Sequence, residues 1–483
     1  MFKGLFAKKS IKALMAEADE PSHRLQKTLG PFSLTALGIG AIIGAGIFVL
    51  TGQAAAQFAG PAVVLSFIFA AIISLFAALC YAEFASMIPI SGSAFSYAYV
   101  TLGEFPAWII GWGLTLEYLF SAATVASGWS AYFVSFFKDV GVIIPTYLSN
   151  TPFAYDAAKG WTMTGAYLNL PAICNAGAIG ILIAIGIKAA ASVNNFLVVI
   201  KMGVILLFIV VGIVYVNADN WKPFIPDNTG VFGQFGLSGI LRGAGVVFFA
   251  YIGFDALSTL AQESRNPQKD LPLGMLGSLA ISTIVYIAIA LVLTGIVSYT
   301  LLGGAAPFST AVDALGSGFL WMRFVVKIAI LAGLTSVVLV MLLGQARIFY
   351  IMAMDGLLPK AFAKVHKRFH TPFFTTIVVT IVCALVAGFF PVEILGQIVS
   401  MGTLMAFAIV CFGVLLLRYT QPHIHRPFKV PFSPWIPGLG TLFCLIQMVV
   451  LPGIIWMQLI GWLIIGCVIY FTYGQKHSRI RSR

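Results

Sequence analysis

The chain has 483 residues, of which 60% are apolar and 9% are charged, and its formal net charge is +12. Its 28 basic and 16 acidic side chains are too few to cover a soluble protein of this length, because soluble proteins carry about 25% charged residues. This composition excludes a soluble enzyme, a nucleic-acid-binding protein and a disordered scaffold, and it provides enough apolar residues for about a dozen spans of roughly 20 residues.

Twelve apolar runs with few charges follow one another along the chain. They predict an all-α integral membrane protein with 12 transmembrane helices. The segment that precedes them, up to Gln26, is expected to form an amphipathic helix on the membrane surface. The runs cover residues 33–57, 61–88, 107–137, 172–187, 195–216, 238–260, 275–299, 320–352, 373–390, 394–417, 437–455 and 457–474.

Basic residues are distributed unequally between the two sides of the predicted bundle. If both termini lie on one side, that side collects 21 Lys and Arg residues, the opposite side has five, and two lie within spans. Cytoplasmic loops of membrane proteins carry the excess of Lys and Arg. We therefore predict a multi-pass protein of the plasma membrane with both termini in the cytoplasm.

Two of the runs contain residues that interrupt a helix. The first includes GIGAIIGAGIF at 38–48, and the sixth includes FFAYIGFD at 248–255. Five spans separate their starts, so the two runs enter the membrane from opposite faces. Broken helices at corresponding positions of two inverted halves mark the substrate site of many secondary transporters. The alternative for the first run is close helix packing through Gly40 and Gly44, a small-xxx-small motif.

Several long stretches resemble the amino acid–polyamine–organocation transporters. GIGAIIGAGIFVLTG at 38–52 resembles the signature of their first span. FFAYIGFDALSTLAQESRNPQKDLPLG at 248–274 is similar to the sixth span and following loop of the cationic amino acid transporter branch. Residues 111–130, 344–359 and 398–419 agree as well, so the resemblance covers about residues 30 to 420.

The resemblance implies a 5+5 inverted repeat with broken helices 1 and 6, followed by two additional helices. It also implies a bacterial-type, proton-coupled permease that imports amino acids by alternating access and has no enzyme activity. The expected segments are a cytoplasmic N-terminal segment at 1–32, the two repeats at 33–217 and 218–419, the two additional helices at 420–475, and a cytoplasmic tail at 476–483.

The resemblance also places the amino acid substrate between the two broken helices. Its carboxylate would bind backbone N–H groups at the start of the outer half-helix, where free amides and the helix dipole favour an anion. Its ammonium group would bind carbonyl groups at the broken ends, so a zwitterion needs no ionised side chain. The predicted substrate-binding backbone consists of Ile42, Ile43, Gly44, Ala45, Gly46, Phe249, Ala250 and Ile252.

Lys201 lies deep within the fifth run, where a charged group is costly. Loss of hydration favours the neutral form of an amine, so this lysine is suited to take up and release a proton. It resembles the lysine that replaces a sodium ion, between the first and eighth spans, in proton-coupled relatives. We therefore expect the proton rather than sodium as the coupling ion, without another cofactor or a metal. The alternative is a permanently charged structural lysine.

Three acids lie within the predicted spans. Glu117, on the third span, is expected to tune the pocket or handle protons, with a buried structural acid as the alternative. Asp255 follows the break at Gly253 and is expected to cap the unwound segment, whereas Glu83 is expected to act as a gate or packing acid. Arg347 is expected to belong to cytoplasmic loop structure.

Met341 bears on the choice of substrate. It stands where transporters of cationic amino acids tend to have a serine, and its bulky apolar side chain favours small or neutral amino acids over arginine and lysine. The remaining alternatives are an amino acid exchanger, a polyamine carrier and, less favoured, a channel or a non-transporting nutrient sensor. No accessory subunit is identified by the sequence.

Overall fold

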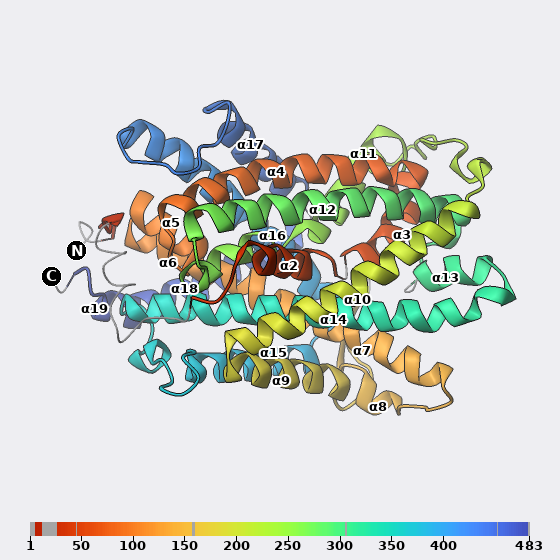
Figure 1. Ribbon diagram of the computed structural model, residues 1–483, viewed down its shortest axis with the longest axis horizontal. Coiled ribbons are helices and arrows are strands. Elements are labelled where there is room, and N and C mark those ends of the chain that lie inside the picture. Colours follow the sequence, from red (N-terminus) through yellow and green to blue (C-terminus); the bar gives the residue numbers. More distant parts are fainter. Residues whose placement is uncertain are drawn as a thin grey trace.

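Apolar helices run along the length of the molecule in the computed structural model (Figure 1). The structure describes residues 5–11, 27–44, 46–156, 160–304, 307–451 and 453–481. Within these ranges, eight helical stretches are long and apolar enough to cross a membrane. They cover Thr51–Met87, Glu104–Asp139, Ile187–Val214, Gly236–Glu263, Pro267–Ile296, Trp321–Met354, Ile398–Thr420 and Gly453–His477.

Four shorter apolar helices accompany these stretches, at Pro31–Ile42, Leu170–Ile185, Phe373–Phe389 and Trp435–Val449. Each predicted apolar run therefore falls on helical structure, and the prediction of a helical membrane protein is confirmed. The stretch Thr51–Met87 is not one straight helix, because Gly60 has a φ of +62°, which an α-helix does not allow. The count of 12 spans and the inverted repeat stay predictions.

Many short helical segments interrupt the first half of the chain. In chain order its elements are α2 (Pro31–Ile42), η1 (Gly46–Leu50), α3 (Thr51–Ala54), η2 (Ala55–Ala59), η3 (Gly60–Ala62), α4 (Val63–Met87), α5 (Ser93–Thr101), α6 (Glu104–Thr115), η4 (Leu116–Phe120), α7 (Ser121–Asp139), α8 (Thr146–Ser149), β1 (Phe153–Asp156), β2 (Gly160–Met163), α9 (Leu170–Ile185), α10 (Ile187–Val214) and η5 (Ala218–Trp221).

The second half begins with another helix that continues through two short segments. Its elements are α11 (Gly236–Val247), η6 (Phe248–Tyr251), η7 (Asp255–Glu263), α12 (Pro267–Ile296), η8 (Tyr299–Leu301), α13 (Pro307–Ala314), η9 (Ser317–Phe319), α14 (Leu320–Met354), η10 (Lys360–Ala363), α15 (Phe373–Phe389), α16 (Val392–Thr420), α17 (Trp435–Val450), α18 (Gly453–Ile469), η11 (Tyr470–Gly474) and α19 (Gln475–His477).

Several short elements were not predicted from the sequence, among them a hairpin and helix α5. The antiparallel hairpin of β1 and β2 pairs Phe153 with Met163 within the segment between the third and fourth runs. Helix α5 is short and buried throughout. Neither is long enough to produce an apolar run, so hydropathy alone does not detect them.

Both described terminal segments meet at the end of α14. The side chain of Lys9 forms a buried ion pair with Asp355, and the backbone N–H of Arg479 donates to the Asp355 carbonyl at 3.1 Å. The two segments therefore lie at the same end of the bundle, as the predicted topology requires. The amphipathic helix predicted up to Gln26 lies outside the described residues, except for residues 5–11.

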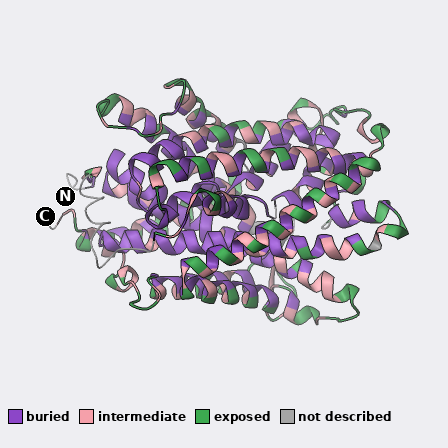
Figure 2. Ribbon diagram, viewed as in Figure 1, coloured by how far each residue is buried: buried purple, intermediate pink, exposed green. Residues whose placement is uncertain are grey.

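Burial separates central helices from peripheral ones (Figure 2). In the most apolar part of the stretch Glu104–Asp139, 83% of the residues are buried, compared with 28% in α10. The outer face of α10 exposes Phe196, Val199 and Val210. Exposed apolar side chains over such a length belong in lipid, where they carry no hydrophobic cost.

Candidate functional site

The first helix break follows α2. Ile43 leaves the helical conformation, with φ −79° and ψ 97°, and helical structure resumes at Gly46 as the π-helical turn η1. The Phe48 N–H then donates to the Gly44 carbonyl at 3.3 Å. Ala45, which was predicted to bind the substrate carboxylate, lies outside the described residues.

The second break lies between η6 and η7. Ile252 is extended, with φ −63° and ψ 135°, and Gly253 has a φ of +123°. A Cβ atom on Gly253 would lie 2.8 Å from the Cβ of Ala41 and 3.0 Å from the Cε of Met341. Glycine is therefore required here for its backbone conformation as well as for space.

The two breaks are in contact with each other. A Cβ atom on Gly46 would lie 2.3 Å from the Cα of Ala250. Tyr286, which is buried on α12, joins them as well, since its hydroxyl lies 2.7 Å from the Ile42 carbonyl oxygen and 2.8 Å from that of Ala250. Sequence analysis did not identify Tyr286, although a tyrosine in an aliphatic run indicates a buried hydrogen-bond partner.

A small cavity lies between the two breaks. Its volume is about 10 Å³, which is enough for about one water molecule. Of the predicted substrate-binding residues, Ile42, Gly44, Gly46, Phe249, Ile252 and Met341 line it, whereas Ile43, Ala250 and Glu117 do not. The remaining lining residues are Ala41, Ser121, Val125 and Val337. Among the described residues, therefore, no ionisable side chain lines the cavity, and its side-chain walls are apolar except for Ser121.

Lys201 lies beside the first break. Its ammonium group donates to the carbonyl oxygens of Ile39 at 3.0 Å, Gly40 at 3.1 Å and Ile43 at 2.9 Å. It also donates to the hydroxyl of Ser336 on α14 at 2.9 Å. The three carbonyls belong to the C-terminal end of α2, where the helix dipole favours a cation. Lys201 thus connects α10, the first break and α14.

Glu117 and Asp255 lie together, off the cavity wall. Both are fully buried, and they are close enough to interact electrostatically. The hydroxyl of Tyr118 donates to Asp255. Glu117 lies on the π-helical turn η4, close to Thr403 and Asp255. These positions leave the predicted roles of both acids untested.

Glu83 lies near the end of α4 and binds the last turn of α16 and the segment that follows it. Its carboxylate accepts from Arg418 at 2.5 Å and from the backbone N–H of Val430 at 2.7 Å, and it lies 3.2 Å from the Nε atom of Arg426. Both predicted roles of Glu83, as a gate or as a packing acid, stay predictions.

Arg347 and Glu263 form a buried ion pair that sequence analysis missed. Arg347 lies within α14 rather than in a loop, and its Nη2 atom donates to Glu263, at the end of η7, at 2.6 Å. Both side chains are 0% exposed. The expectation that Arg347 belongs to loop structure is wrong because this partner, 84 positions away in the chain, compensates its charge inside the bundle.

Removing one partner of this pair should destabilise the protein strongly. In Arg347→Met, the Glu263 carboxylate stays buried without a counter-charge, which costs about 3–5 kcal/mol. We expect a clearly lower midpoint of thermal unfolding in detergent. Lys222→Met is the control, because the pair of Lys222 and Asp219 is 76% and 77% exposed and such pairs contribute little. Equal midpoints for the two variants would contradict the prediction.

The chain matches known membrane transporters over nearly its whole length. Residues 29–473 match the model of the amino acid permease family. The branched-chain amino acid permease BcaP of Bacillus subtilis is 44% identical over 479 residues, which cover 99% of both chains.

Two further relatives extend this comparison. The methylthioribose transporter of Bacillus subtilis is also 44% identical, over 99% of both chains. The vacuolar cationic amino acid transporter 4 of Arabidopsis thaliana is 36% identical over 418 residues, which cover 86% of this chain and 68% of the relative. The resemblance found in the sequence motifs is thereby confirmed.

Proposed function

The chain belongs to the amino acid permease family, and from this premise we propose that it imports neutral amino acids with apolar side chains across the plasma membrane. The observation that carries the choice of substrate is the cavity between the breaks, whose described lining has no ionisable side chain and is apolar except for Ser121. A cationic side chain would require a buried carboxylate on this wall. Glu117, which was predicted to tune the pocket or handle protons, is not among the lining residues.

The backbone of the two breaks is suited to the common part of any amino acid. Unwound backbone leaves N–H and C=O groups without helical partners, and Gly44 of the first break and Ile252 of the second break line the same cavity. We assign the carboxylate of the substrate to the N–H side and its ammonium group to the carbonyl side. The fold would be two inverted five-helix repeats plus two helices, with both termini in the cytoplasm.

The transport cycle follows from the size of the cavity. A volume of about 10 Å³ cannot hold an amino acid, so the walls formed by α2, α7, η6 and α14 must separate to admit one. Alternating access provides this separation on one side of the membrane at a time. We propose that Lys201 couples the cycle to protons, because it contacts the first break and α14 at once. Sodium is the less favoured ion.

Uptake of labelled amino acids into proteoliposomes, with and without an inwardly directed proton gradient, tests this function. We expect leucine, isoleucine or valine to accumulate only with the gradient, and lysine and arginine to be excluded. Uptake that needs substrate inside the vesicles but no gradient would assign an exchanger instead. Labelled methylthioribose belongs in the same panel, because a relative named for it is as similar as BcaP.

Met341 should set the size of the accepted side chain. In Met341→Ser the cavity gains the volume of a thioether chain, so we expect discrimination between alanine and leucine to fall by about tenfold in kcat/KM. Met405→Ser is a suitable control, because Met405 does not line the cavity. If both variants keep the selectivity of the parent protein, Met341 does not determine specificity.

A further inference from the structure

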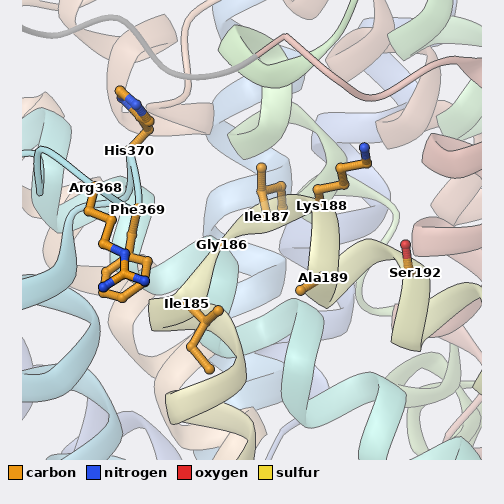
Figure 3. A pocket seen from close by; sticks show the side chains of 9 residues that line it. All are labelled: Ile185, Gly186, Ile187, Lys188, Ala189, Ser192, Arg368, Phe369 and His370. Carbon is orange, nitrogen blue, oxygen red and sulfur yellow. The ribbon is translucent and has the colours of Figure 1, made fainter.

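A second cavity, of about 410 Å³, opens at the surface where α9 ends and α10 begins (Figure 3). The segment before α15 forms its other side. That segment starts after Asp355, the residue that both terminal segments contact, so the cavity lies toward that end of the bundle. Its lining consists of Ile185, Gly186, Ile187, Lys188, Ala189, Ser192, Arg368, Phe369 and His370.

The segment that carries Arg368 is held in place against α9. The hydroxyl of Thr371 donates to the carbonyl of Ala184 at 2.9 Å. The backbone N–H groups of Arg368 and Phe369 donate to the Nδ1 atom of His366 at 3.2 and 3.3 Å. The guanidinium carbon of Arg368 lies 5.7 Å from the centre of the Phe369 ring. The cationic side of the cavity is therefore folded in place before any ligand arrives.

The charged side chains that line this cavity, among the residues that the structure describes, are all basic. Lys188 and Arg368 line it, and within the described ranges neither side chain forms an ion pair. The sequence contains no acidic residue between Asp156 and Asp219 or between Asp355 and Glu393. Uncompensated cations in a concave surface concentrate anions. The cavity thus fits a ligand with a negative group.

The surroundings of the cavity are apolar and face outward. Ile185 borders it on α9, Phe196 lies further along α10, and Phe374 lies in the first turn of α15, and all three side chains are exposed. In a membrane, such side chains contact the acyl chains of lipids. A ligand that combines an anionic group with long apolar chains would use both parts of this surface, whereas a free anion would use the charged part alone.

We propose that this cavity binds the phosphate headgroup of an anionic phospholipid. Lys188 and Arg368 supply positive charge from opposite sides of the cavity (Figure 3). Ser192 and His370 are further polar residues of its lining, and the acyl chains lie along the exposed sides of α9 and α10. Basic pockets between transmembrane helices are known sites for such headgroups. The lipid would then hold the start of α10, the helix that carries Lys201, against the segment before α15.

The test compares lipid retention by variants in nanodiscs of phosphatidylcholine and phosphatidylglycerol. After transfer to detergent, native mass spectrometry counts the phosphatidylglycerol molecules that stay bound. We expect the variant with Lys188→Gln and Arg368→Gln to retain about fivefold less for each charge removed. The control carries Lys360→Gln and Lys364→Gln, two exposed lysines of the same segment that do not line the cavity, and should retain as much as the parent protein.

Equal retention by the two double variants, whether high or low, would overturn the proposal, because general surface charge would then explain binding. A parallel sample in pure phosphatidylcholine receives inorganic phosphate. If phosphate alone raises the unfolding midpoint as much as phosphatidylglycerol does, and displaces that lipid, the site takes a free phosphate and the lipid assignment is wrong. Should the double variant not fold, Lys188→Gln alone is compared with Lys360→Gln.

Discussion

Replacing Gly46 with alanine should abolish uptake while the protein still folds. The new Cβ atom would lie 2.3 Å from the Cα and 2.8 Å from the backbone nitrogen of Ala250. Backbone atoms cannot rotate away as a side chain can, so η1 and η6 must separate and the walls of the closed cavity no longer meet. Overpacking costs about 1–3 kcal/mol, and at the upper end of this range we expect transport to fall about 100-fold in the proteoliposome assay.

A matched glycine provides the control for this experiment. Gly177 lies within α9, and a Cβ atom there would meet no atom within 4 Å, so Gly177→Ala should transport normally. Gly44→Val tests the contact between the first break and α14 in the same way. Even a Cβ atom at this position would lie 2.5 Å from the side chain of Val337 on α14. Size-exclusion chromatography shows whether each variant is folded. Normal uptake by folded Gly46→Ala would show that the contact between the breaks is not needed for transport.

Replacing Lys201 with methionine should remove accumulation driven by the proton gradient. The variant keeps a similar volume but has no group that binds a proton, and it leaves the carbonyls of Ile39, Gly40 and Ile43 without their shared donor. We expect the internal concentration of substrate to stop at the external value, whereas the parent protein exceeds it. The measurement is accumulation in proteoliposomes with an acidic exterior, together with exchange of labelled substrate in the absence of a gradient.

Arginine at the same position separates coupling from structure. Its guanidinium group keeps the charge and the donors but does not release a proton. A coupling role therefore predicts loss of accumulation in both Lys201→Met and Lys201→Arg. Ser336→Ala, which removes one of the four acceptors and leaves the amine, should still accumulate substrate. Full accumulation by Lys201→Arg would assign Lys201 a structural role.

The helical membrane fold and the two breaks could be predicted from local sequence. Long apolar runs leave few alternatives to helices in lipid, since every backbone group needs a partner. The break at Gly253 is also a local property, because its φ of +123° is a conformation that other residues rarely adopt. These features need no knowledge of what packs against them.

The parts that were missed depend on contacts distant in the chain. The partners of Tyr286 are 244 and 36 positions away, and the pairing of Arg347 with Glu263 is equally invisible in either segment alone. A charged residue near the end of an apolar run ordinarily marks its exit from the membrane. Only the packed bundle shows that Arg347 is compensated within it.

The position of Glu117 could not be predicted from the sequence for a different reason. Ser121 lines the cavity, and in an α-helix a residue four positions earlier would share its face. The structure has a π-helical turn at Leu116–Phe120, and the wider turn shifts the register of side chains before it. Glu117 therefore lies beside Asp255 instead of on the wall. Periodicity in the sequence does not show where such a turn occurs.

Two carbonyl oxygens compete for the hydroxyl hydrogen of Tyr286 when no substrate is bound. A phenol carries one hydrogen, yet two carbonyl oxygens, those of Ile42 and Ala250, lie within hydrogen-bond distance of it. At any instant one of them has no donor from the tyrosine. In the proposed cycle, an arriving ammonium group would bind this acceptor first and then the other, as the hydroxyl turns away. Tyr286 would then hold the two broken ends together until the substrate replaces it.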